Sequence, residues 1–593
     1  MPFDGLFMYA VCQELNEKLQ QGRIEKIYQP GREELVLVVS RPGERYRLLL
    51  HAGAENARVH LTEETRPNPT APPVFCMLLR KHLEGYKISG FRQRGLDRVL
   101  DIAVDCRDEL GRPAVKSLVC EVMGRHSNII LVSRPDNIIL DGIKRYTHAV
   151  SRHREVLPGQ PYIPPPAQGK INPFSVTEED FRELLLAGRL DDSLAAIMHQ
   201  KLDGLSTATC REIVNLGGLE PDTVLNYCGE HELRSLWRSL QGVLEAARAG
   251  SLRATLVCRP DGEPVDFFPL AVAQQEGLHY ITGGANETAD EFFSRKEARE
   301  TLRRQRKMLL DRVKKECRRV RKKLQIQKNS LHESGKAEQY RLYGELITAN
   351  LHRLRRGMRE IELQNYHDPQ GQTVVIPLRP ELSGPENAQL YFKKYNKAKN
   401  TAEAARKMIA TGEEELQYLE SVATALEMAS GIAELQEIKQ ELASQGYINE
   451  PPVLGSPKHG KSRRREHLEP LSYISSDGFT VLVGRNNRQN DALTLKTADD
   501  SDIWLHTCKI PGAHVIIRTG GRQVPERTLL EAASLAAYYS RARDSANVPV
   551  DYTLCKHVKK PSGARPGFVI YEQQKTIFVN PRPDAMRPAG PEH

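Results

Sequence analysis

Two long stretches with apolar residues at heptad spacing constrain this chain more than any other feature. The first stretch places apolar residues three, four or seven apart at Leu310, Val313, Cys317, Val320, Leu324 and Leu331. The second continues in the same way at Leu419, Val422, Leu426, Ala429 and Ala433, and after a phase slip at Leu435, Ile438 and Leu442. This spacing is typical of helices that pair along one seam. It predicts an antiparallel coiled-coil hairpin over 286–445, with a middle or tip insert at about 336–395.

The positive charge of the chain is concentrated on the first of these helices. Residues 295–328 contain sixteen Lys or Arg against four Asp or Glu, whereas the formal net charge of the whole chain is +9. The remaining residues are therefore slightly acidic in sum. A basic stripe on one helix favours nucleic acid or an anionic membrane surface as its partner. The arm residues that we expect to meet such a polyanion are Arg303, Arg304, Lys314, Lys315, Arg318, Arg319, Arg321 and Lys322.

The rest of the chain predicts a multidomain α+β protein, because 593 residues correspond to about four domains of ordinary size. Short apolar runs and two amphipathic helices predict a mixed α/β domain over 1–170. Helices interrupted at Leu202–Ser206 (L-D-G-L-S) predict a helix-hairpin-helix domain over 171–285. Its glycine turn could present N–H groups to a phosphate, and any helical hairpin also needs such a turn. A basic linker (446–466), an α/β domain (467–581) and a disordered tail (582–593) complete the chain.

Several functional classes are disfavoured by what the sequence lacks. The ten cysteines are scattered without a C-x-x-C pair, which argues against a zinc ribbon and a disulfide scaffold. No stretch approaches the ~18 apolar residues that a membrane span needs, and the N-terminus does not read as a signal peptide. No G-x-x-x-x-G-K-[ST] loop occurs. We therefore expect a cytoplasmic protein with no metal, no cofactor, no membrane contact and no nucleotide hydrolysis.

The last domain contains the polar motifs best suited to RNA. A run of glycine, arginine and amide side chains (V-G-R-N-N-R-Q-N-D) can form a turn whose donors face one side and suit phosphate. An aromatic side chain beside two histidines could stack a base or sugar, whereas a core tryptophan with satisfied histidines is the simpler interpretation of the same spacing. The candidate RNA-binding residues are Gly484, Arg485, Asn486, Asn487, Asn490, Asp491, Asp502, Trp504, His506 and His514.

Taken together, these motifs resemble those of the NFACT family. The resemblance rests on the run just described, D-I-W-L-H, P-G-A-H-V-I-I-R and the opening M-P-F-D-G. It also rests on P-P-V-F-C-M-L-L-R-K-H-L-E-G (72–85), G-L-D-R (95–98) and E-V-M-G-R-H-S-N (121–128). The order of the predicted domains agrees, so the resemblance covers nearly the full chain. Ala513 departs from it, because relatives often have Ser there.

The resemblance implies that the protein itself catalyses no reaction. Proteins of this family bind a large ribosomal subunit (50S in bacteria) that still holds a peptidyl-tRNA and its nascent chain after a stalled ribosome has split. They recruit tRNA, in bacteria tRNA-Ala, and promote a C-terminal alanine tail that marks the chain for degradation without mRNA. The resemblance also implies an N-terminal domain like that of formamidopyrimidine-type DNA glycosylases, and an arm that lies along rRNA and ribosomal proteins.

The resemblance also assigns particular residues. Asp97 and Arg98 match the family's Asp-Arg pair, which engages tRNA. Arg can bond a base edge or a phosphate with two donors, and Asp can accept from a base amino group, whereas the residues alone would suggest a turn ion pair of small energetic value. A second motif lies between two strands and contacts RNA or shapes the domain through Glu121, Met123, Gly124, His126, Ser127 and Asn128.

Two alternative functions compete with this interpretation. A DNA glycosylase would use the amine of Pro2 as a nucleophile, but Phe3 occupies the position of that enzyme's catalytic glutamate and the zinc-ligand cysteines are missing. A fibronectin-binding surface adhesin would need a signal peptide, an anchor or repeats. Neither alternative accounts for the basic arm and the C-terminal motifs together, so we expect an adaptor rather than an enzyme.

Overall fold

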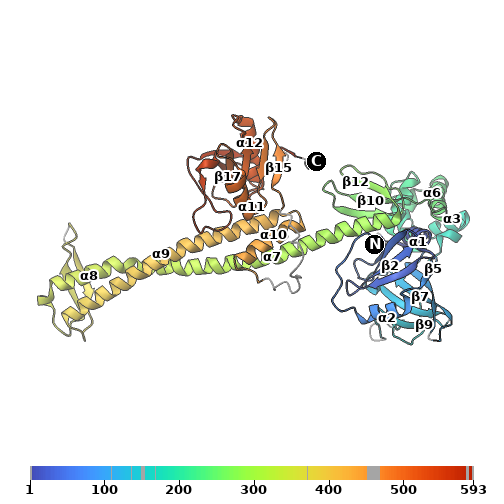
Figure 1. Ribbon diagram of the computed structural model, residues 1–593, viewed down its shortest axis with the longest axis horizontal. Helices are drawn as coiled ribbons and strands as arrows, with labels where there is room; N and C mark the ends of the chain where they lie inside the picture. Colours follow the sequence, from blue (N-terminus) through green and yellow to red (C-terminus); the bar gives the residue numbers. More distant parts are fainter. Residues whose placement is uncertain are drawn as a thin grey trace. The chain divides into compact units, whose positions relative to one another are not determined.

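The computed structural model describes residues 3–108, 110–134, 136–147, 154–166, 168–369, 372–449, 468–582 and 586–589. By their internal contacts the residues separate into two compact units, 1–300 and 301–593 (Figure 1). Pro2, most of the predicted linker and parts of the predicted tail lie outside the described residues.

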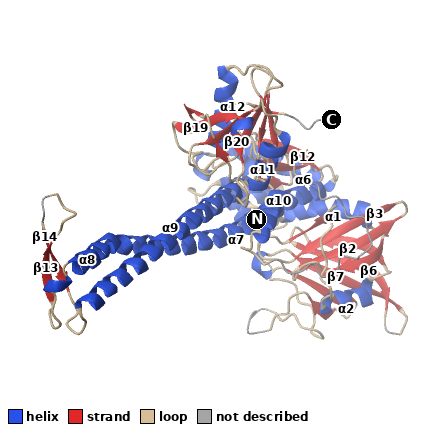
Figure 2. Cartoon of the chain, turned by 60° about the vertical axis from the view of Figure 1, so that its left-hand side comes forward, coloured by secondary structure: helices blue, strands red, loops and turns tan. Residues whose placement is uncertain are grey.

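A nine-stranded antiparallel sheet forms the centre of the first unit (Figure 2). Its order is β4-β3-β2-β1-β5-β6-β7-β8-β9. The strands are β1 (Arg23–Tyr28), β2 (Glu34–Arg41), β3 (Glu44–His51), β4 (Arg58–Leu61), β5 (Lys87–Gln93), β6 (Val99–Arg107), β7 (Pro113–Glu121), β8 (Asn128–Arg134) and β9 (Ile138–Gly142). Helices α1 (Gly5–Leu19) and α2 (Val74–Leu83) share the apolar core of this sheet. Asp4 begins α1, because its carboxylate accepts from Phe7 N at 2.9 Å.

Four helices and a small sheet complete the first unit. The helices share a second apolar core and are α3 (Glu178–Leu186), α4 (Leu194–Lys201), α5 (Thr207–Leu216) and α6 (Glu230–Arg248). The segment Leu202–Ser206 joins α4 to α5. The strands β10 (Ala254–Cys258), β11 (Pro264–Phe268) and β12 (His279–Gly283) form a sheet in the order β11-β10-β12.

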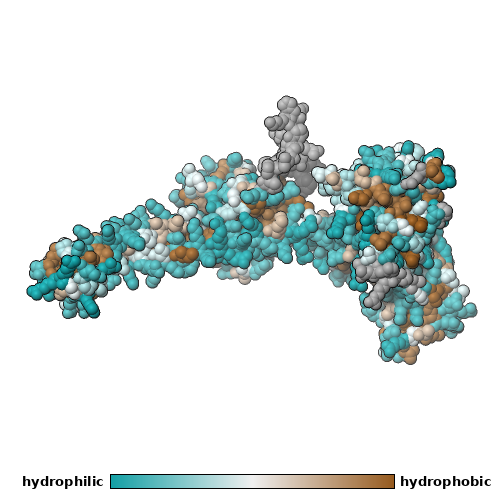
Figure 3. All heavy atoms as spheres, turned by 90° about the horizontal axis from the view of Figure 1, so that it is seen from below, coloured by the Kyte–Doolittle hydropathy of each residue, from teal (hydrophilic) through white to brown (hydrophobic). Residues whose placement is uncertain are grey.

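The longest helix, α7 (Ala285–Glu333), continues from the first unit into the second. In the second unit it packs against α9 (Gly384–Met428), burying the heptad seam that includes Val313, Cys317 and Val320. The long helix fits the predicted coiled coil, and Leu309 rather than Leu310 is its fully buried position. The solvent-facing surface of this helical stretch is mostly hydrophilic, as Figure 3 shows.

The return helix does not run on through residue 445, as the heptads predict. It ends at Met428, and α10 (Ile432–Ser444) follows a turn at 429–431. Tyr418 Oη donates to Glu441 Oε1 at 3.0 Å, and Tyr447 Oη donates to Glu415 Oε1 at 3.1 Å. These contacts place α10 antiparallel to α9, so the phase slip in the heptads marks a reversal of the chain. Ala433, which we expected in the seam, is exposed.

A small element with its own core lies between α7 and α9. It consists of α8 (Ala337–Ala349), β13 (Glu360–Gln364) and β14 (Thr373–Pro377), and the two strands pair antiparallel. Leu346, Ile347 and Ile376 are among its buried residues.

The C-terminal part of the second unit is built on a seven-stranded sheet in the order β22-β19-β17-β18-β16-β15-β23. Its strands are β15 (Leu471–Ile474), β16 (Thr480–Val483), β17 (Ile503–Thr507), β18 (Val515–Arg518), β19 (Val548–Leu554), β22 (Lys575–Val579) and β23 (Arg587–Pro588). Helix α12 (Glu526–Tyr538) shares its core, and the short α11 (Asn487–Ala492) follows β16.

One loop and one expectation complete the description of this region. Gly567–Ile570 is a loop that ends at the short β21 (Ile570–Tyr571), which pairs with β20 (Val558–Lys559). A strand is disfavoured there because Gly567 has φ +78°. In the predicted disordered tail, Arg587 and Pro588 pair with β15.

Two further observations concern the described residues as a whole. Within them, no helix has both the length and the apolar character that crossing a membrane requires. Across the same ranges, no group of three or more His, Cys, Asp or Glu side chains is placed to hold a metal ion.

Candidate nucleic-acid interfaces

A cavity of about 680 Å³ in the first unit brings together three motifs that lie far apart in the sequence. The turn between β5 and β6 contributes Asp97 and Arg98, and the turn between β7 and β8 contributes Met123 and His126. Asp203 comes from the segment between α4 and α5. The remaining lining residues are Arg94, Gly95, Tyr146, Arg154, Pro165, Pro166, Gln168, Gly169 and Lys170.

The Asp97–Arg98 turn is held by its own backbone and by one amide side chain. Arg98 N donates to Asp97 Oδ1 at 2.8 Å, and Gln93 Nε2 donates to Asp97 O at 2.9 Å. Val122 N donates to Arg98 O at 2.9 Å, which connects this turn to the E-V-M-G-R-H-S-N motif. Both side chains are half-buried at the cavity. The turn is therefore preorganised, which lowers the entropy cost of binding a ligand there.

Asp4 and Gly5 of the opening motif hold the hairpin of α4 and α5 against this turn. Asp4 Oδ2 accepts from Ser206 N at 3.0 Å and from Thr209 Oγ1 at 2.6 Å. A Cβ on Gly5 would lie 1.8 Å from Leu96 O, and one on Gly204 would lie 2.3 Å from Leu96 Cβ. Only glycine permits this approach, so the two glycines set how close Asp203 comes to Asp97.

The E-V-M-G-R-H-S-N motif divides into structural residues and cavity residues. Glu121 is fully buried and holds Arg154, which donates from one nitrogen at 2.6 Å, and Tyr162, whose hydroxyl donates at 2.9 Å. Ser127 and Asn128 are also buried.

Both of these polar side chains bond the backbone around them. Ser127 Oγ accepts from Met123 N at 2.8 Å, and Asn128 bonds the backbone of Lys144. Gly124 has φ +58° at the start of the turn. Within this motif, Met123 and His126 reach the cavity, while Glu121, Ser127 and Asn128 shape it.

The charge of the cavity is mixed, with basic groups around two carboxylates. The basic lining residues are Arg94, Arg98, Arg154 and Lys170, of which Arg154 is paired with Glu121, and the acidic ones are Asp97 and Asp203. Burial raises the pKa of Asp97, and the nearby charge of Asp203 adds to that shift. Such a site can combine phosphate contacts from Arg and Lys with a carboxylate that reads a base amino group.

Several residues that line the cavity were not identified by the sequence motifs. The main ones are Arg94, Tyr146, Arg154, Lys170 and Asp203. Asp203 was signalled only as part of the glycine hairpin, and Arg94 directly precedes the G-L-D-R motif. The others come from segments whose approach to the turn depends on the tertiary fold.

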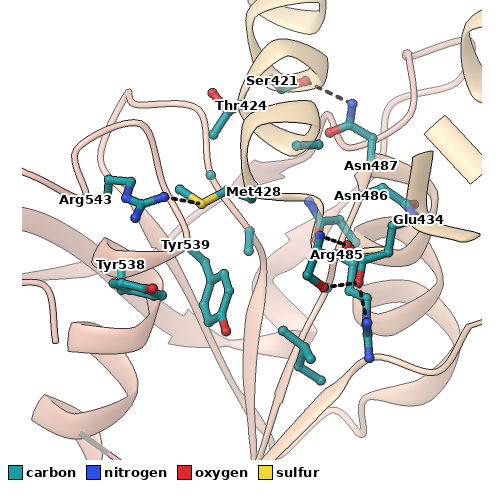
Figure 4. A pocket seen from close by; sticks show the side chains of 17 residues that line it. Ser421, Thr424, Met428, Glu434, Arg485, Asn486, Asn487, Tyr538, Tyr539 and Arg543 are labelled. Carbon is teal, nitrogen blue, oxygen red and sulfur yellow. Dashed lines mark hydrogen bonds and ion pairs between the residues drawn. The ribbon is translucent and has the colours of Figure 1, made fainter. Parts of the chain in front are cut away.

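The polar run of the C-terminal domain bonds α10 instead of facing solvent (Figure 4). Arg485 pairs with Glu434, and Asn486 Nδ2 donates to Glu437 Oε2 at 2.7 Å. Asn487 Nδ2 donates to Glu441 Oε1 and to Ser421 Oγ, both at 3.0 Å. In this arrangement the donors face one side, as expected, and contact α9 and α10; that they bind phosphate stays a prediction.

Other residues of the run are tied within the C-terminal domain. Asn490 Oδ1 accepts from His514 N at 3.1 Å, and a Cβ on Gly484 would lie 2.1 Å from that oxygen. Asp491 pairs with Lys560.

Trp504, His506, His514 and Asp502 belong to the core or close to it. Trp504 is fully buried, which fits the simpler interpretation, a core tryptophan, and not a ring exposed for base stacking. Its ring centroid lies 5.7 Å from that of His506 and 5.3 Å from that of His514. Burial lowers the pKa of His506 to about 4 and that of His514 well below its usual value, so both rings are neutral at pH 7. Asp502 is buried and accepts from Thr519 N at 2.8 Å.

The eight predicted basic residues of α7 are all exposed. Several are partly neutralised by α9, because Lys314 lies 3.9 Å from Glu427, Arg319 lies 3.6 Å from Glu415, and Arg321 pairs with Glu420 at 2.6 Å. Across the described part of the chain, five of the eight take part in no ion pair. Arg318 Nε donates to the carbonyl of Lys314 at 3.3 Å, and the other four, Arg303, Arg304, Lys315 and Lys322, make no side-chain hydrogen bond either. These four are the strongest candidates for contact with a polyanion.

Comparison with known proteins gives concordant matches over most of the chain. The family model for the NFACT N-terminal and middle domains matches residues 4–462, and the model for the NFACT protein RNA binding domain matches residues 470–572. The chain is 39% identical to the Rqc2 homolog RqcH of Bacillus subtilis (strain 168), over 99% of both chains. It is 21% identical to the ribosome quality control complex subunit NEMF homolog of Drosophila melanogaster, over 90% of this chain and 60% of that protein.

Several solved structures match about half of the chain, and one of them illustrates the likeness. It is the N-terminal part of the fibronectin/fibrinogen-binding protein from Streptococcus suis, 30% identical, covering 49% of this chain and 99% of that chain, with a TM-score of 0.41. The two family models together span the sheet domain, the helical hairpin, the long helices and the C-terminal domain. This chain therefore belongs to the NFACT family.

Proposed function

We propose that this protein is a ribosome quality control factor that acts on large (50S) ribosomal subunits carrying a peptidyl-tRNA. It recruits tRNA, specifically tRNA-Ala, and promotes extension of the nascent chain with alanine in the absence of mRNA. The extended chain is then marked for degradation. Membership of the NFACT family and the names of the relatives support the quality control role.

The observation that carries the tRNA part of the proposal is the convergence of three separate motifs on one cavity. Asp97, Arg98 and His126 reach it from two turns of the sheet, and Asp203 reaches it from the helical hairpin. The stability of the fold alone does not require positively and negatively charged side chains to gather at one cavity. A cavity with guanidinium groups beside carboxylates suits an RNA strand whose bases are accessible.

In this proposal the protein positions substrates, and the peptidyl-transferase RNA of the ribosome forms the peptide bond. Positioning alone can supply a large part of a rate enhancement, because it converts a bimolecular encounter into an intramolecular one. The basic residues of α7 that make no ion pair would hold the protein on rRNA. The polar motifs would set its position on that RNA.

The proposal is tested by crosslinking and RNA sequencing from cells that express the wild type or Asp97→Ala/Arg98→Ala. The wild type should enrich large-subunit rRNA and tRNA-Ala. The double variant should retain rRNA crosslinks and lose most of the tRNA, because its arm is unchanged.

The matched control is Arg211→Ala/Asp222→Ala, which removes an exposed ion pair from the same unit. It should crosslink like the wild type. Absence of both large-subunit rRNA and any enriched tRNA from the wild-type sample would refute the proposed function.

A further inference from the structure

Helix α10 has two faces with different partners in the second unit. Leu435, Ile438 and Leu442 are buried in the core shared with α7 and α9. Glu434, Glu437 and Glu441 lie on the face toward the C-terminal domain, where they accept hydrogen bonds. These carboxylates are three and four residues apart, so they form a stripe along one side of the helix.

Every residue from 485 to 489 directs its side chain to this stripe or to the helices beside it. Asn486 Nδ2 and Gln489 Nε2 both donate to Glu437 Oε2, at 2.7 and 3.0 Å. Arg485 pairs with Glu434, as Figure 4 shows. Asn487 bonds Glu441, and an Arg488 guanidinium nitrogen donates to Ser444 Oγ at 2.7 Å.

The chemistry of this donor row is that of a site for anionic oxygens. Two Arg and three amide side chains converge on oxygens that follow one another along a line, which is also how the phosphates of an RNA strand are presented. Arginine and side-chain amides are common donors to RNA and DNA phosphates. The row also lies within the part of the chain that matches the RNA-binding domain of the family.

The α10 side of the contact includes a carboxylate in an unfavourable setting. Glu441 is 1% exposed, and burial raises its pKa. Its partners are the neutral groups of Asn487 and Tyr418. The charge of Arg488 lowers the pKa of Glu441 without reversing the effect of burial, so burying this carboxylate costs free energy and weakens the docking of α10.

We propose that residues 485–489 form a binding site for the sugar-phosphate backbone of single-stranded RNA, and that α10 is its built-in competitor. The carboxylates of Glu434, Glu437 and Glu441 take the positions of phosphates, so RNA binding and docking of α10 exclude each other. Because the apolar face of α10 is buried against α7 and α9, RNA binding requires the C-terminal domain to separate from the carboxylate face of α10 while α10 stays in that core. This inference adds a regulated RNA site to the proposed function and does not involve the cavity at Asp97.

The test is the affinity of the full chain for a fluorescein-labelled 20-nucleotide single-stranded RNA, measured by anisotropy at 150 mM salt. The variant Glu434→Gln/Glu437→Gln keeps the shape of α10 and removes two competing charges. We expect it to bind the RNA about 10-fold more tightly than the wild type. Adding Arg485→Ala to that variant should cancel the gain.

The matched control is Glu414→Gln/Glu526→Gln, which removes two exposed carboxylates of the same unit; in the described part of the chain neither forms a hydrogen bond or ion pair with residues 485–489. It should bind within twofold of the wild type. Hydrogen exchange gives a second measurement, because RNA should increase exchange in 432–444.

An unchanged affinity of Glu434→Gln/Glu437→Gln, or a gain equal to that of the control, would overturn the inference. So would unchanged exchange of α10 at saturating RNA. Neither result bears on tRNA recruitment through Asp97 and Arg98, which is measured by the crosslinking experiment.

Discussion

At the scale of single residues, most of the motif positions act by bringing other positions together. Gly5 and Gly204 allow the close contact with Leu96, and Glu121 holds Arg154 and Tyr162 behind the cavity. Asp4 joins the start of the chain to the hairpin through Ser206 and Thr209. Residue identity in these motifs is therefore explained by packing and hydrogen bonding around the cavity more often than by contact with a ligand.

The effect of the close contact between Gly204 and Leu96 can be measured separately from the effect of the backbone conformation of Gly204. Gly204→Ala places a Cβ 2.3 Å from Leu96 Cβ at φ +73°, whereas Gly218→Ala has φ +75° with nothing within 4 Å. Both substitutions incur about 1–2 kcal/mol of backbone strain, and Gly204→Ala adds the clash. We expect Gly204→Ala to lower the thermal midpoint further and to reduce tRNA crosslinking, while Gly218→Ala leaves crosslinking unchanged. Equal effects of the two substitutions would contradict this account.

The buried histidines predict how the stability of the C-terminal domain depends on pH. His506 has a pKa lowered to about 4, and the pKa of His514 is lower than usual as well, so the unfolded chain binds more protons below pH 6.5. The free energy of unfolding should therefore rise with pH between about 4 and 6.5 and level off above. Each such histidine contributes up to about 1.4 kcal/mol per pH unit. Glu441, whose pKa is raised, contributes with the opposite sign.

The measurement is urea unfolding followed by Trp504 fluorescence in a Trp237→Phe background, from pH 4.5 to 7.5. His506→Gln should reduce the slope below pH 6.5. A wild-type slope that is zero or negative in this window would be inconsistent with neutral buried histidines.

At the scale of elements, the sequence predicted best where one periodicity applies over a long stretch. The heptads predicted the packed seam of α7 and α9, because coiled-coil packing is local and repeats. They did not predict the turn at 429–431, since α10 uses the same apolar spacing to pack back on α9. Strands such as β5, with Gly90 inside it, and β12, which is largely exposed, have no clear alternation and depend on their neighbours.

The candidate sites could likewise be predicted only in part, because their geometry depends on tertiary contacts. The motifs identified Asp97, Arg98, Met123 and His126, but their meeting with Asp203 depends on contacts between residues about a hundred positions apart. The donors of 485–487 were identified by type, and their partner was missed because Glu434, Glu437 and Glu441 looked like ordinary solvent-facing positions of a heptad helix. Sequence patterns indicate which groups are available, and tertiary contacts decide what they meet.

The division of the α7 arm into paired and unpaired basic residues gives a prediction at this scale. Replacing Arg303, Arg304, Lys315 and Lys322 by Gln should weaken binding to 50S subunits. It should also make the plot of log affinity against log salt less steep, by roughly one unit of slope for each phosphate that the arm no longer neutralises. Replacing Lys314, Arg319, Arg321 and Lys328 by Gln should have a smaller effect, because these residues pair with carboxylates of α9 or α7. Salt titrations of subunit binding distinguish the two sets. Equal slopes would show that the pairing on the arm is irrelevant to binding.

At the scale of the whole molecule, the net charge of +9 gives little guidance to function. The positive charge lies on one helix that is partly neutralised by its partner, and the two candidate RNA sites are small and of mixed polarity. In the proposed function, non-specific attraction to RNA and selection among RNAs would therefore be carried by different parts of the chain. This division suits an adaptor that binds a large RNA surface and positions a second RNA on it.

The most direct test is reconstituted elongation on purified 50S subunits that carry a peptidyl-tRNA, without 30S subunits or mRNA. The subunits are mixed with the protein and a full set of aminoacyl-tRNAs, and the released peptides are analysed by mass spectrometry. The account predicts C-terminal tails of alanine that require the protein and are lost with Asp97→Ala/Arg98→Ala. Peptides that remain unextended, or tails of the same length with the double variant, would contradict it.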